Sequence, residues 1–454
     1  MDLHIELTGD VPLRRQLERA LRDAIRSGRL VAGSTLPPTR ILAEELGVSR
    51  GVVVDSYAQL AAEGYLATQQ GSGTRVAFVP SPPPVPRRET KAPPRVRFDL
   101  RPGLADLHGF PRARWQAAVT RALRETPDAR LTYPNAQGFP ELRRALAEYL
   151  ARARAAIADP DDVVVACSSA HAMSTLWRVL HRRGARRVAV EDPGWHWQRL
   201  TVERAGLEAV PIEVDEHGLV VSRLDEHDLD AVVLTAAHQY PTGVVLSPER
   251  RTDLIAWARR TRSLVVEDDY DAEYRYDREP VASLQGLAPD VVVYCGTASK
   301  TLAPALRLAW LVAPDRLIDA LTDELRITGA NPPALDQAAL ARFVGDSELD
   351  RHLRRMRRQY RGKRAILLAE LHRHLPGVTI GGAAAGLHLL AWLPDGADER
   401  SIGAAARASG VAVHELHRHC AVFAPQPPAL LLGYAFPTVS ELRAAMRLLA
   451  IAAR

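Results

Sequence analysis

A lysine at residue 300 stands close to side chains that suit a phosphate group. The segment YCGTASK ends at Lys300, and Arg307 follows seven residues later. A lysine that forms a Schiff base needs a phosphate anchor nearby, because such a cofactor is held at both ends. The hydroxyls of Thr297 and Ser299 and the planar fork of Arg307 would form this anchor. The alternative interpretation is a solvated lysine at the end of a strand.

The lysine count favours Lys300 as the reactive amine. The chain has 59 basic residues, but the only lysines are Lys91, Lys300 and Lys363. Lys91 lies in a proline-rich stretch and Lys363 in an arginine-rich helix, and neither place predicts a pocket. Chemistry that needs a primary amine therefore points to Lys300.

A second group of polar residues follows another apolar run. Asp268 and Tyr270 belong to the segment EDDYDAEYRYDRE, which directly follows Leu264–Val266. Ligands bind at the carboxyl ends of strands in open α/β sheets. A buried carboxylate there would keep a pyridine nitrogen protonated, and a phenol would donate to a ring oxygen. The alternative is an ordinary charged surface run.

These candidate residues follow different strands, so they can form one site only if a sheet brings the ends of those strands together. Apolar strand-like runs alternate with helical patterns such as Met173–His181 and Glu249–Arg260. This alternation predicts a mainly parallel sheet with helices on both faces, within a domain spanning 99–454. Residues 350–454 should form a smaller α+β subdomain. The predicted strands are Val163–Ala166, Arg187–Val190, Ala231–Leu234, Leu264–Val266 and Val291–Tyr294.

The first 79 residues have a different pattern. One helical face is marked by apolar residues from Leu13 to Ile25, and a second helix is expected over Thr39–Leu46. A third begins after the cap Ser49 and ends near Glu63, before two strands, Tyr65–Gln70 and Thr74–Val79. Helix, turn, helix and hairpin predict a winged helix-turn-helix, which binds duplex DNA. A small helical interaction domain is the alternative.

Arginine positions, and not net charge, support DNA binding, since residues 1–79 hold nine arginines and nine acidic residues. The third helix would present its first residues to base edges in the major groove. Arg40 suits backbone contact, and a glycine-rich wing tip allows close approach to the sugar-phosphate chain. The predicted DNA-binding residues are Arg40, Ser49, Arg50, Gly51, Gly71, Ser72, Gly73 and Thr74.

Residues 80–98, PSPPPVPRRETKAPPRVRF, form a basic proline-rich linker between the two domains. The hydrophobic fraction is 47% and the charged fraction 25%, with no apolar run long enough to cross a bilayer and no signal-peptide pattern. We therefore expect a cytoplasmic protein with no membrane role. The cysteines Cys167, Cys295 and Cys420 are too scattered for a disulfide framework or metal-ligand spacing, so no metal site is predicted.

Residues 11–76 closely resemble the DNA-binding domain of the GntR family, through LPPTRILAEELGVSR and EGYLATQQGSGT. The lysine and aspartate segments resemble fold-type I aminotransferases. Together they resemble the MocR subfamily over about Val11 to Leu449, in which an aminotransferase-like domain serves as effector sensor. This implies a pyridoxal-phosphate-dependent transcription regulator, a homodimer, and operator DNA with repeated half-sites.

The resemblance also implies residue roles. Lys300 would be the catalytic lysine joined to pyridoxal phosphate, with Asp268 on the ring nitrogen and Tyr270 on the ring oxygen. The phosphate would be held by Arg307, Thr297, Ser299 and the backbone amides of Ala170 and His171. Trp195 would stack near the ring, Tyr133 would reach the neighbouring subunit's phosphate, and Arg418 would anchor an amino-acid carboxylate.

Three residues depart from the aminotransferase pattern. Tyr240, in HQYPTG, replaces the asparagine that contacts the ring oxygen, a form usual for the regulators. Ser169 replaces a common glycine, and Trp197 stands where a relative has an arginine for a second effector carboxylate. The alternatives left open are an amino-acid or amine sensor, a working aminotransferase with an accessory DNA-binding domain, and a sensor of pyridoxal phosphate itself.

Overall fold

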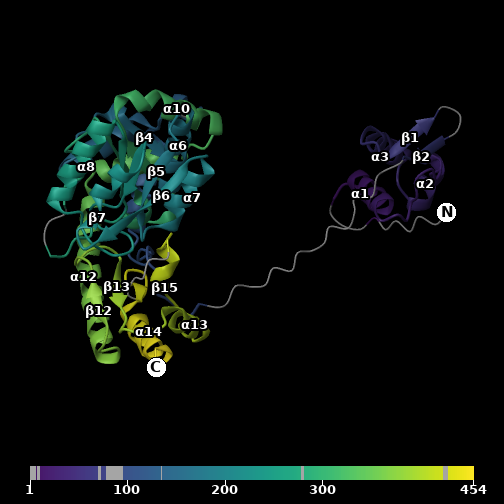
Figure 1. The fold of residues 1–454 in the computed structure, drawn as a ribbon. Coiled ribbons are helices and arrows are strands. Elements are labelled where there is room, and N and C mark those ends of the chain that lie inside the picture. The colour runs from purple at the N-terminus through teal and green to yellow at the C-terminus, as the bar shows by residue number, and fades with distance from the viewer. Residues whose placement is uncertain are drawn as a thin grey trace. The chain divides into compact units, whose positions relative to one another are not determined.

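A computed structural model describes residues 7, 11–69, 73–77, 96–133, 135–277, 281–422 and 428–453. The chain divides into two compact units, Met1–Pro93 and Pro94–Arg454 (Figure 1). Each unit has its own core, and we describe each by itself. No helix in the described part is long and apolar enough to span a membrane.

The first unit consists of three helices and a hairpin. Its elements are α1 (Leu13–Arg26), α2 (Thr39–Leu46), α3 (Arg50–Ala62), β1 (Leu66–Gln69) and β2 (Gly73–Val76). Gly47 ends α2 with φ +64°, a conformation that costs glycine little. The Ser49 Oγ caps α3 by accepting from the Val52 N–H at 3.4 Å. The strands pair antiparallel, Leu66 opposite Val76.

The three helices meet in one core. Leu17 and Leu21 of α1, Leu42 of α2, and Val53 and Leu60 of α3 are fully buried. This core orients α3 so that its opposite side, which begins with Arg50, faces solvent. The winged helix-turn-helix architecture is therefore as predicted. The strands are shorter than expected, and Phe78 and Val79 lie outside the described residues.

The second unit is built on an eight-stranded sheet of order β4-β11-β10-β9-β8-β5-β6-β7. Strands β10, β9, β8, β5 and β6 run parallel, whereas β11 is antiparallel to both neighbours. The strands are β4 (Val163–Ala166), β5 (Arg187–Asp192), β6 (Glu208–Asp215), β7 (Gly218–Leu219), β8 (Ala231–Leu234), β9 (Leu264–Asp269), β10 (Val292–Thr297) and β11 (Ala309–Val312). All five predicted strands are present, and β6, β7 and β11 are additional.

Both faces of this sheet are covered. Along β5, Val188 and Val190 pack into one apolar cluster and Ala189 into another, because successive side chains of a strand point to opposite faces. Helices α6, α7 and α10 contribute to the first cluster and α8 to the second (Figure 1). The helices of this part are α4 (Arg112–Glu125), α5 (Pro140–Arg154), α6 (Ser169–Arg182), α7 (His196–Arg204), α8 (Pro248–Thr261), α9 (Ala298–Thr301), α10 (Asp315–Thr328) and α11 (Ala334–Gly345).

The remaining residues form the smaller α+β part. Its sheet has the order β12-β13-β16-β15. Its elements are α12 (Glu348–His374), β12 (Thr379–Gly381), β13 (His388–Trp392), α13 (Glu399–Ala408), β14 (Val411–Ala412), β15 (His414–Glu415), β16 (Ala429–Gly433) and α14 (Val439–Ala452). The two-residue strand β3 (Phe98–Asp99) pairs in parallel with β14.

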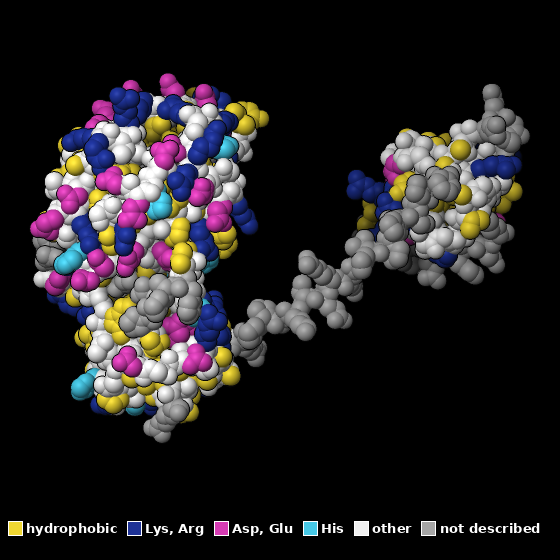
Figure 2. Space-filling view, viewed as in Figure 1, with side chains coloured by type: hydrophobic (Ala, Val, Ile, Leu, Met, Phe, Trp, Pro, Cys, Tyr) yellow, Lys and Arg dark blue, Asp and Glu magenta, His cyan; other side chains and the backbone are white. Residues whose placement is uncertain are grey.

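Short 3-10 helices span Asp128–Arg130, Pro160–Asp162, Val221–Glu226, Pro304–Leu306 and Leu416–His419. On the face seen in Figure 2, basic and acidic side chains are interspersed over the described part of the second unit. The fold class predicted from the sequence is confirmed, including the mainly parallel sheet and the smaller α+β subdomain.

Candidate functional site

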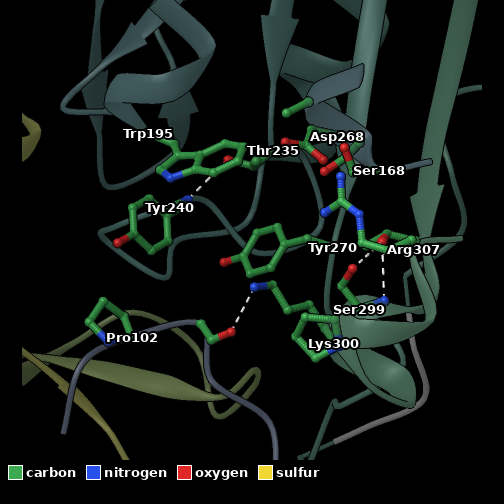
Figure 3. Close-up of a pocket in the computed structure, with 15 residues that line it drawn as sticks. Pro102, Ser168, Trp195, Thr235, Tyr240, Asp268, Tyr270, Ser299, Lys300 and Arg307 are labelled. Carbon is green, nitrogen blue, oxygen red and sulfur yellow. Dashed lines mark hydrogen bonds between the residues drawn. The ribbon is translucent and has the colours of Figure 1, made fainter. Parts of the chain in front are cut away.

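A cavity of about 290 Å³ opens at the carboxyl ends of β5, β8, β9 and β10, beside the first turn of α6 (Figure 3). This is the edge at which open α/β sheets bind ligands. The lining residues are Pro102, Gly103, Ser168, Ser169, Ala170, Trp195, Thr235, Tyr240, Asp268, Tyr270, Thr297, Ser299, Lys300, Pro304 and Arg307. Eight residues predicted to bind a cofactor are among them.

Lys300 projects into this cavity from α9, the short helix that follows β10. Its Nζ donates to the backbone oxygen of Gly103 at 2.6 Å (Figure 3). Burial lowers the pKa of Lys300, although the carboxylates of Asp271 and Asp268 oppose this shift. A lowered pKa raises the fraction of neutral amine, which is the nucleophilic form. The lysine is therefore part of a cavity wall and not a solvated side chain.

Asp268 lies across the cavity at the end of β9. It is buried, and its Oδ2 accepts from the Gln198 Nε2 at 2.8 Å. Burial raises the pKa of Asp268 to about 6, against the opposing hydrogen bond from Gln198. A partly desolvated carboxylate in this position is suited to pair with a cationic ring nitrogen.

The run around Asp268 is not a surface segment. Glu267, Asp268, Asp269 and Asp271 are all at most 6% exposed. Strand alternation turns Asp269 away from the cavity, where its Oδ2 pairs with the Arg154 Nε at 2.7 Å. The surface interpretation of this acidic segment is therefore wrong.

Tyr270 is held by the residues behind it. Its hydroxyl donates to the backbone oxygen of His238 at 3.0 Å and lies 3.1 Å from the Nδ1 of that ring. Asp271 Oδ1 lies 3.1 Å from the same Nδ1. His238, Asp271 and His388 form a buried group whose potential metal-ligand atoms lie within 4.8 Å of one another. The contacts on Nδ1 already give His238 and Asp271 a positioning role toward Tyr270.

Another corner of the cavity carries anion-binding groups. The Arg307 guanidinium extends into it, and no ion pair joins this group to any other residue in the described ranges (Figure 3). The hydroxyl of Thr297 donates to Ser299 Oγ at 3.0 Å. Ser168, Ser169 and Ala170 of the α6 N-terminus face the same space. A free guanidinium, hydroxyls and a helix N-terminus together suit a phosphate.

His171 takes a different position from its predicted neighbours. Its backbone N–H donates to the capping Ser168 Oγ at 3.1 Å, and its ring Nδ1 accepts from the Cys167 N–H. It is not among the residues that line the cavity. The α6 cap therefore uses the amide that was expected to reach the phosphate.

Aromatic side chains form the wall facing Lys300. Trp195 precedes α7, and Tyr240 lies in the loop after β8 (Figure 3). The Tyr240 N–H donates to Thr235 Oγ1 at 3.0 Å, and the hydroxyl of Thr235 donates to Glu191 Oε2 at 2.6 Å. Sequence reasoning noted Tyr240 but gave no role to Thr235, Pro102 or Gly103. A polar residue directly after β8 was the available signal for Thr235.

Two further predicted residues, in addition to His171, lie outside the cavity. Tyr133 is fully exposed, which leaves its expected role toward a neighbouring subunit as a prediction. Arg418 is not among the lining residues, and its Nε pairs with Glu415 Oε2 at 2.5 Å. The predicted carboxylate anchor therefore already has a buried anionic partner.

In the first unit, the start of α3 is exposed. Arg50 and Gly51 face solvent, as does Arg40 in the first turn of α2. Within the described residues no ion pair involves Arg40 or Arg50, whereas Arg22 of α1 pairs with Glu63 at 2.8 Å. Gly51 has a negative φ, and a Cβ there would meet only Ser49 Oγ at 3.9 Å. The fold therefore does not require glycine at residue 51.

The wing is described in part. Gly73 is exposed and Thr74 half-buried, and the neighbouring Arg75 is exposed on β2, a basic residue that sequence reasoning did not select. Gly71 and Ser72 lie outside the described residues. Unpaired arginines thus occur on α2, α3 and β2, the elements expected to contact DNA.

Comparison with known proteins identifies the family of each unit. Residues 13–76 match the family described as bacterial regulatory proteins, gntR family, and residues 107–416 match aminotransferase class I and II. The chain is 34% identical to the probable rhizopine catabolism regulatory protein MocR of Rhizobium meliloti, covering 95% of this chain and 92% of that protein. It is 35% identical to the pyridoxine biosynthesis transcriptional regulator PdxR of Corynebacterium glutamicum, covering 85% of each.

Among solved structures, an archaeal alanine:glyoxylate aminotransferase aligns with a TM-score of 0.71 at 25% identity, covering 78% of this chain and 90% of that one. A kynurenine aminotransferase of Pyrococcus horikoshii aligns with the same TM-score at 24% identity. The second unit therefore has the fold of these aminotransferases.

Proposed function

The chain belongs to the MocR subfamily of GntR-type regulators, DNA-binding proteins with an aminotransferase-like domain; from this premise we propose that pyridoxal phosphate bound at Lys300 controls operator binding. The observation that carries the proposal is the cavity itself. It places an amine, a buried carboxylate and a guanidinium that has no ion pair among the described residues around one space, on Lys300, Asp268 and Arg307.

The residues fit the cofactor group by group. Lys300 suits the aldehyde, because burial favours its neutral amine. Arg307, Thr297, Ser299 and the start of α6 suit the phosphate. When bound, pyridoxal phosphate supplies an electrophilic carbon for an amine and a ring that accepts electrons.

The remaining residues orient that ring. Asp268 holds a proton at the ring nitrogen, and the desolvation that raises its pKa is offset by this cationic partner. Tyr270 would give the ring oxygen the hydroxyl proton that it donates to the His238 backbone oxygen in this structure, and Trp195 would cover one ring face. In this proposal His171 contributes through the α6 N-terminus, and Arg418 has no contact with the cofactor.

The first unit would bind operator DNA through α3. Arg50 and Gly51 approach base edges, Ser49 caps the helix, and Arg40 contacts the phosphate chain. The wing residues Gly71, Ser72, Gly73 and Thr74 would follow the adjacent backbone.

A homodimer carrying two such units would bind repeated half-sites. Large apolar side chains near the end of α4 support this assembly, since Leu123 is 59%, Leu131 55% and Tyr133 100% exposed. Tyr133 would reach the cofactor phosphate of the neighbouring subunit.

The test is the visible absorbance of the purified chain titrated with pyridoxal phosphate. The wild type should develop a band that Lys300→Ala lacks. Lys91→Ala is the matched control, because it removes a lysine of the proline-rich linker, and its band should equal that of the wild type. Equal bands in all three proteins would exclude Lys300 as the reactive amine.

The same preparation separates a regulator from an enzyme. Rapid conversion to the amine form of the cofactor with an amino acid, and no selective binding to any DNA sequence, would support the aminotransferase alternative. Selective DNA binding that is lost in Arg50→Ala supports the regulator.

A further inference from the structure

Three titratable side chains meet behind Tyr270, outside the set of residues that lines the cavity. His238 follows β8, Asp271 follows β9, and His388 begins β13 of the smaller α+β part. Their exposed fractions are 3%, 1% and 2%. One potential ligand atom from each side chain lies within 4.8 Å of those of the other two. Residue types that bind metals thus converge here from segments that are distant in the sequence.

His388 is the member of this group that lacks hydrogen bonds. Neither of its ring nitrogens makes one within the described residues, although both are buried. The ring lies 5.3 Å from the ring of His238, between centroids. Buried polar atoms in native proteins are nearly always paired, and an unpaired one indicates a water or an ion that the protein atoms do not replace.

His388 is in the state that binds a metal. Burial lowers its pKa to about 3, although the Asp271 carboxylate and the backbone oxygen of Pro241 oppose this shift. The ring is therefore neutral near pH 7, and neutral imidazole is a common metal ligand. Metal-binding histidines usually direct their second nitrogen at a backbone carbonyl or carboxylate. The Pro241 oxygen suits that role, and the other ring nitrogen would then face a cation.

Asp271 supplies a negative charge without a permanent cation beside it. Within the described residues its ion-pair partner is His238, which is charged only when it is protonated, and no lysine or arginine pairs with it. A buried charge is unfavourable unless an opposite charge or hydrogen bonds compensate it. A divalent cation between Asp271 and the two histidines would provide this compensation.

The distances suit a cation in place of a proton. His238 Nδ1 lies 3.1 Å and 3.2 Å from the two carboxylate oxygens of Asp271. Two metal–ligand bonds of about 2.0–2.2 Å at a tetrahedral angle would place nitrogen and oxygen about 3.3–3.6 Å apart. A cation therefore requires the two side chains to move by only a few tenths of an ångström. The proton shared by Nδ1 and the carboxylate would leave to solvent as the metal binds.

Gly386 leaves the space beside these atoms unfilled by a side chain. Its φ is +70°, and a Cβ there would lie 2.4 Å from His238 Nδ1 and 2.5 Å from Asp271 Oδ2. The Gly386 oxygen accepts from the hydroxyls of Tyr276 at 2.6 Å and Tyr434 at 2.7 Å, which fixes the backbone just before β13. The two ligand atoms are thus approached by backbone alone from this side.

The ligand set determines the class of metal. Two imidazoles and one carboxylate suit Zn²⁺ and other divalent transition metals, whereas Mg²⁺ and Ca²⁺ prefer oxygen ligands throughout. A water molecule would complete a four-coordinate site. The Tyr270 hydroxyl, 3.1 Å from His238 Nδ1, is placed to hydrogen-bond with that water.

We propose that His238, Asp271 and His388 bind one Zn²⁺ or similar divalent transition metal, which ties the smaller α+β part to the ends of β8 and β9. The site includes neither Lys300 nor the phosphate-binding residues, so this inference does not rest on the proposed function. It departs from the expectation of no metal site, which considered the spacing of cysteines. Ligands on three separate segments give no such spacing.

The experiment uses the full-length chain, untagged, stripped of metal with a chelator and dialysed. Zn²⁺ alone is the probe, titrated in competition with a chromophoric chelator. The wild type should bind one equivalent tightly, and His388→Gln should weaken its Kd by roughly 100-fold or more, since loss of an outer-shell partner alone costs about 10–100-fold. His372→Gln removes an exposed histidine of α12 and is the matched control, which should bind as wild type does.

Thermal unfolding of the same proteins provides a second readout. Zn²⁺ should raise the Tm of the wild type and of His372→Gln, because a ligand that binds only the folded state stabilises it. It should leave the Tm of His388→Gln unchanged. Asp271→Asn keeps the shape of the side chain and removes the anionic ligand, so it serves as a second variant if His388→Gln does not fold.

Two results would overturn the proposal. Equal Zn²⁺ affinity in the wild type and a folded ligand variant would place the ion elsewhere, and no tight binding by the wild type would leave water as the partner of His388. Anomalous diffraction at the zinc absorption edge, from crystals grown with one equivalent of Zn²⁺, gives the position directly. A peak bonded to His238, Asp271 and His388 is expected, and a peak only at other residues would contradict the site.

Discussion

The negative charge of Asp268 should destabilise the cofactor-free fold but strengthen binding of the cofactor. Burial raises its pKa from 3.8 to about 6. Between these values the folded chain binds a proton that the unfolded chain has released, so stability falls as pH rises through this window, and the loss persists at pH 7. Asn has no charge to desolvate. The cofactor-free Asp268→Asn protein should therefore be about 1–3 kcal/mol more stable than the wild type at pH 7.

Urea unfolding of the cofactor-free proteins measures this difference, which should shrink as the pH approaches about 4. The same variant should bind pyridoxal phosphate more weakly, because the ring nitrogen loses its anionic partner. Asp290→Asn is the control: Arg259 lowers the pKa of Asp290, so its removal should give no gain in stability. A less stable Asp268→Asn protein at pH 7 would contradict this assignment.

Arg50 is the residue that we expect to read a DNA base directly. It is exposed at the start of α3 and free of ion pairs within the described residues. Arg50→Ala should cost about 1–3 kcal/mol of specific operator binding if the side chain reads a base. Arg19→Ala on α1, 84% exposed at its side chain, should change binding little. Gel-shift titrations compare the two, and an unchanged operator affinity for Arg50→Ala would remove it from the interface.

At the scale of elements, we expect operator binding to outweigh helix stability in α3. Glycine lowers helix stability relative to alanine, and packing does not require it here, because a Cβ at residue 51 would meet only Ser49 Oγ, at 3.9 Å. Gly51→Ala should stabilise the first unit by about 0.5–1 kcal/mol. It should nevertheless weaken operator binding by roughly tenfold, or ~1.4 kcal/mol, because the methyl group blocks close approach. Thermal melts and gel shifts measure the two effects, and an undiminished operator affinity would contradict the proposed docking of α3.

The five strands that sequence patterns predicted are short, nearly continuous apolar runs within the strand–helix alternation. β4 and β8 match their predicted bounds, whereas β11, which begins two residues after Arg307, was missed. Antiparallel β11 also interrupts the strand–helix alternation used for prediction. A four-residue apolar run gives no indication of its partners or direction.

The candidate site was predictable where local sequence determines it. Lys300 and Arg307 follow β10, and Asp268 is the second-last residue of the neighbouring strand β9. The contact between Lys300 and Gly103 spans 197 residues, and no local pattern indicates it. Glu415, the partner of Arg418, lies only three residues away in the sequence. The sequence alone does not show that the Glu415 side chain is buried and available to pair with Arg418.

At the scale of the whole molecule, the proposed homodimer would bring two DNA-binding units together. Leu131→Glu, near the exposed Tyr133, should dissociate the proposed dimer, because a charge would be buried in an apolar interface. Operator affinity should fall with it, since a monomer binds one half-site. Leu287→Glu is the matched control, because Leu287 is also 55% exposed but lies in another part of the unit. Sedimentation velocity gives the oligomeric state, and a Leu131→Glu dimer with full operator affinity would exclude this interface.

The coupling between the two units depends on Lys300 in this account. The most direct measurement is the operator Kd of full-length wild type and Lys300→Ala, each with and without saturating pyridoxal phosphate. The wild-type Kd should shift roughly 5- to 150-fold, and the Kd of Lys300→Ala should not respond. A wild-type Kd that is unchanged while absorbance shows bound cofactor, or an equal shift in both proteins, would contradict regulation through this lysine.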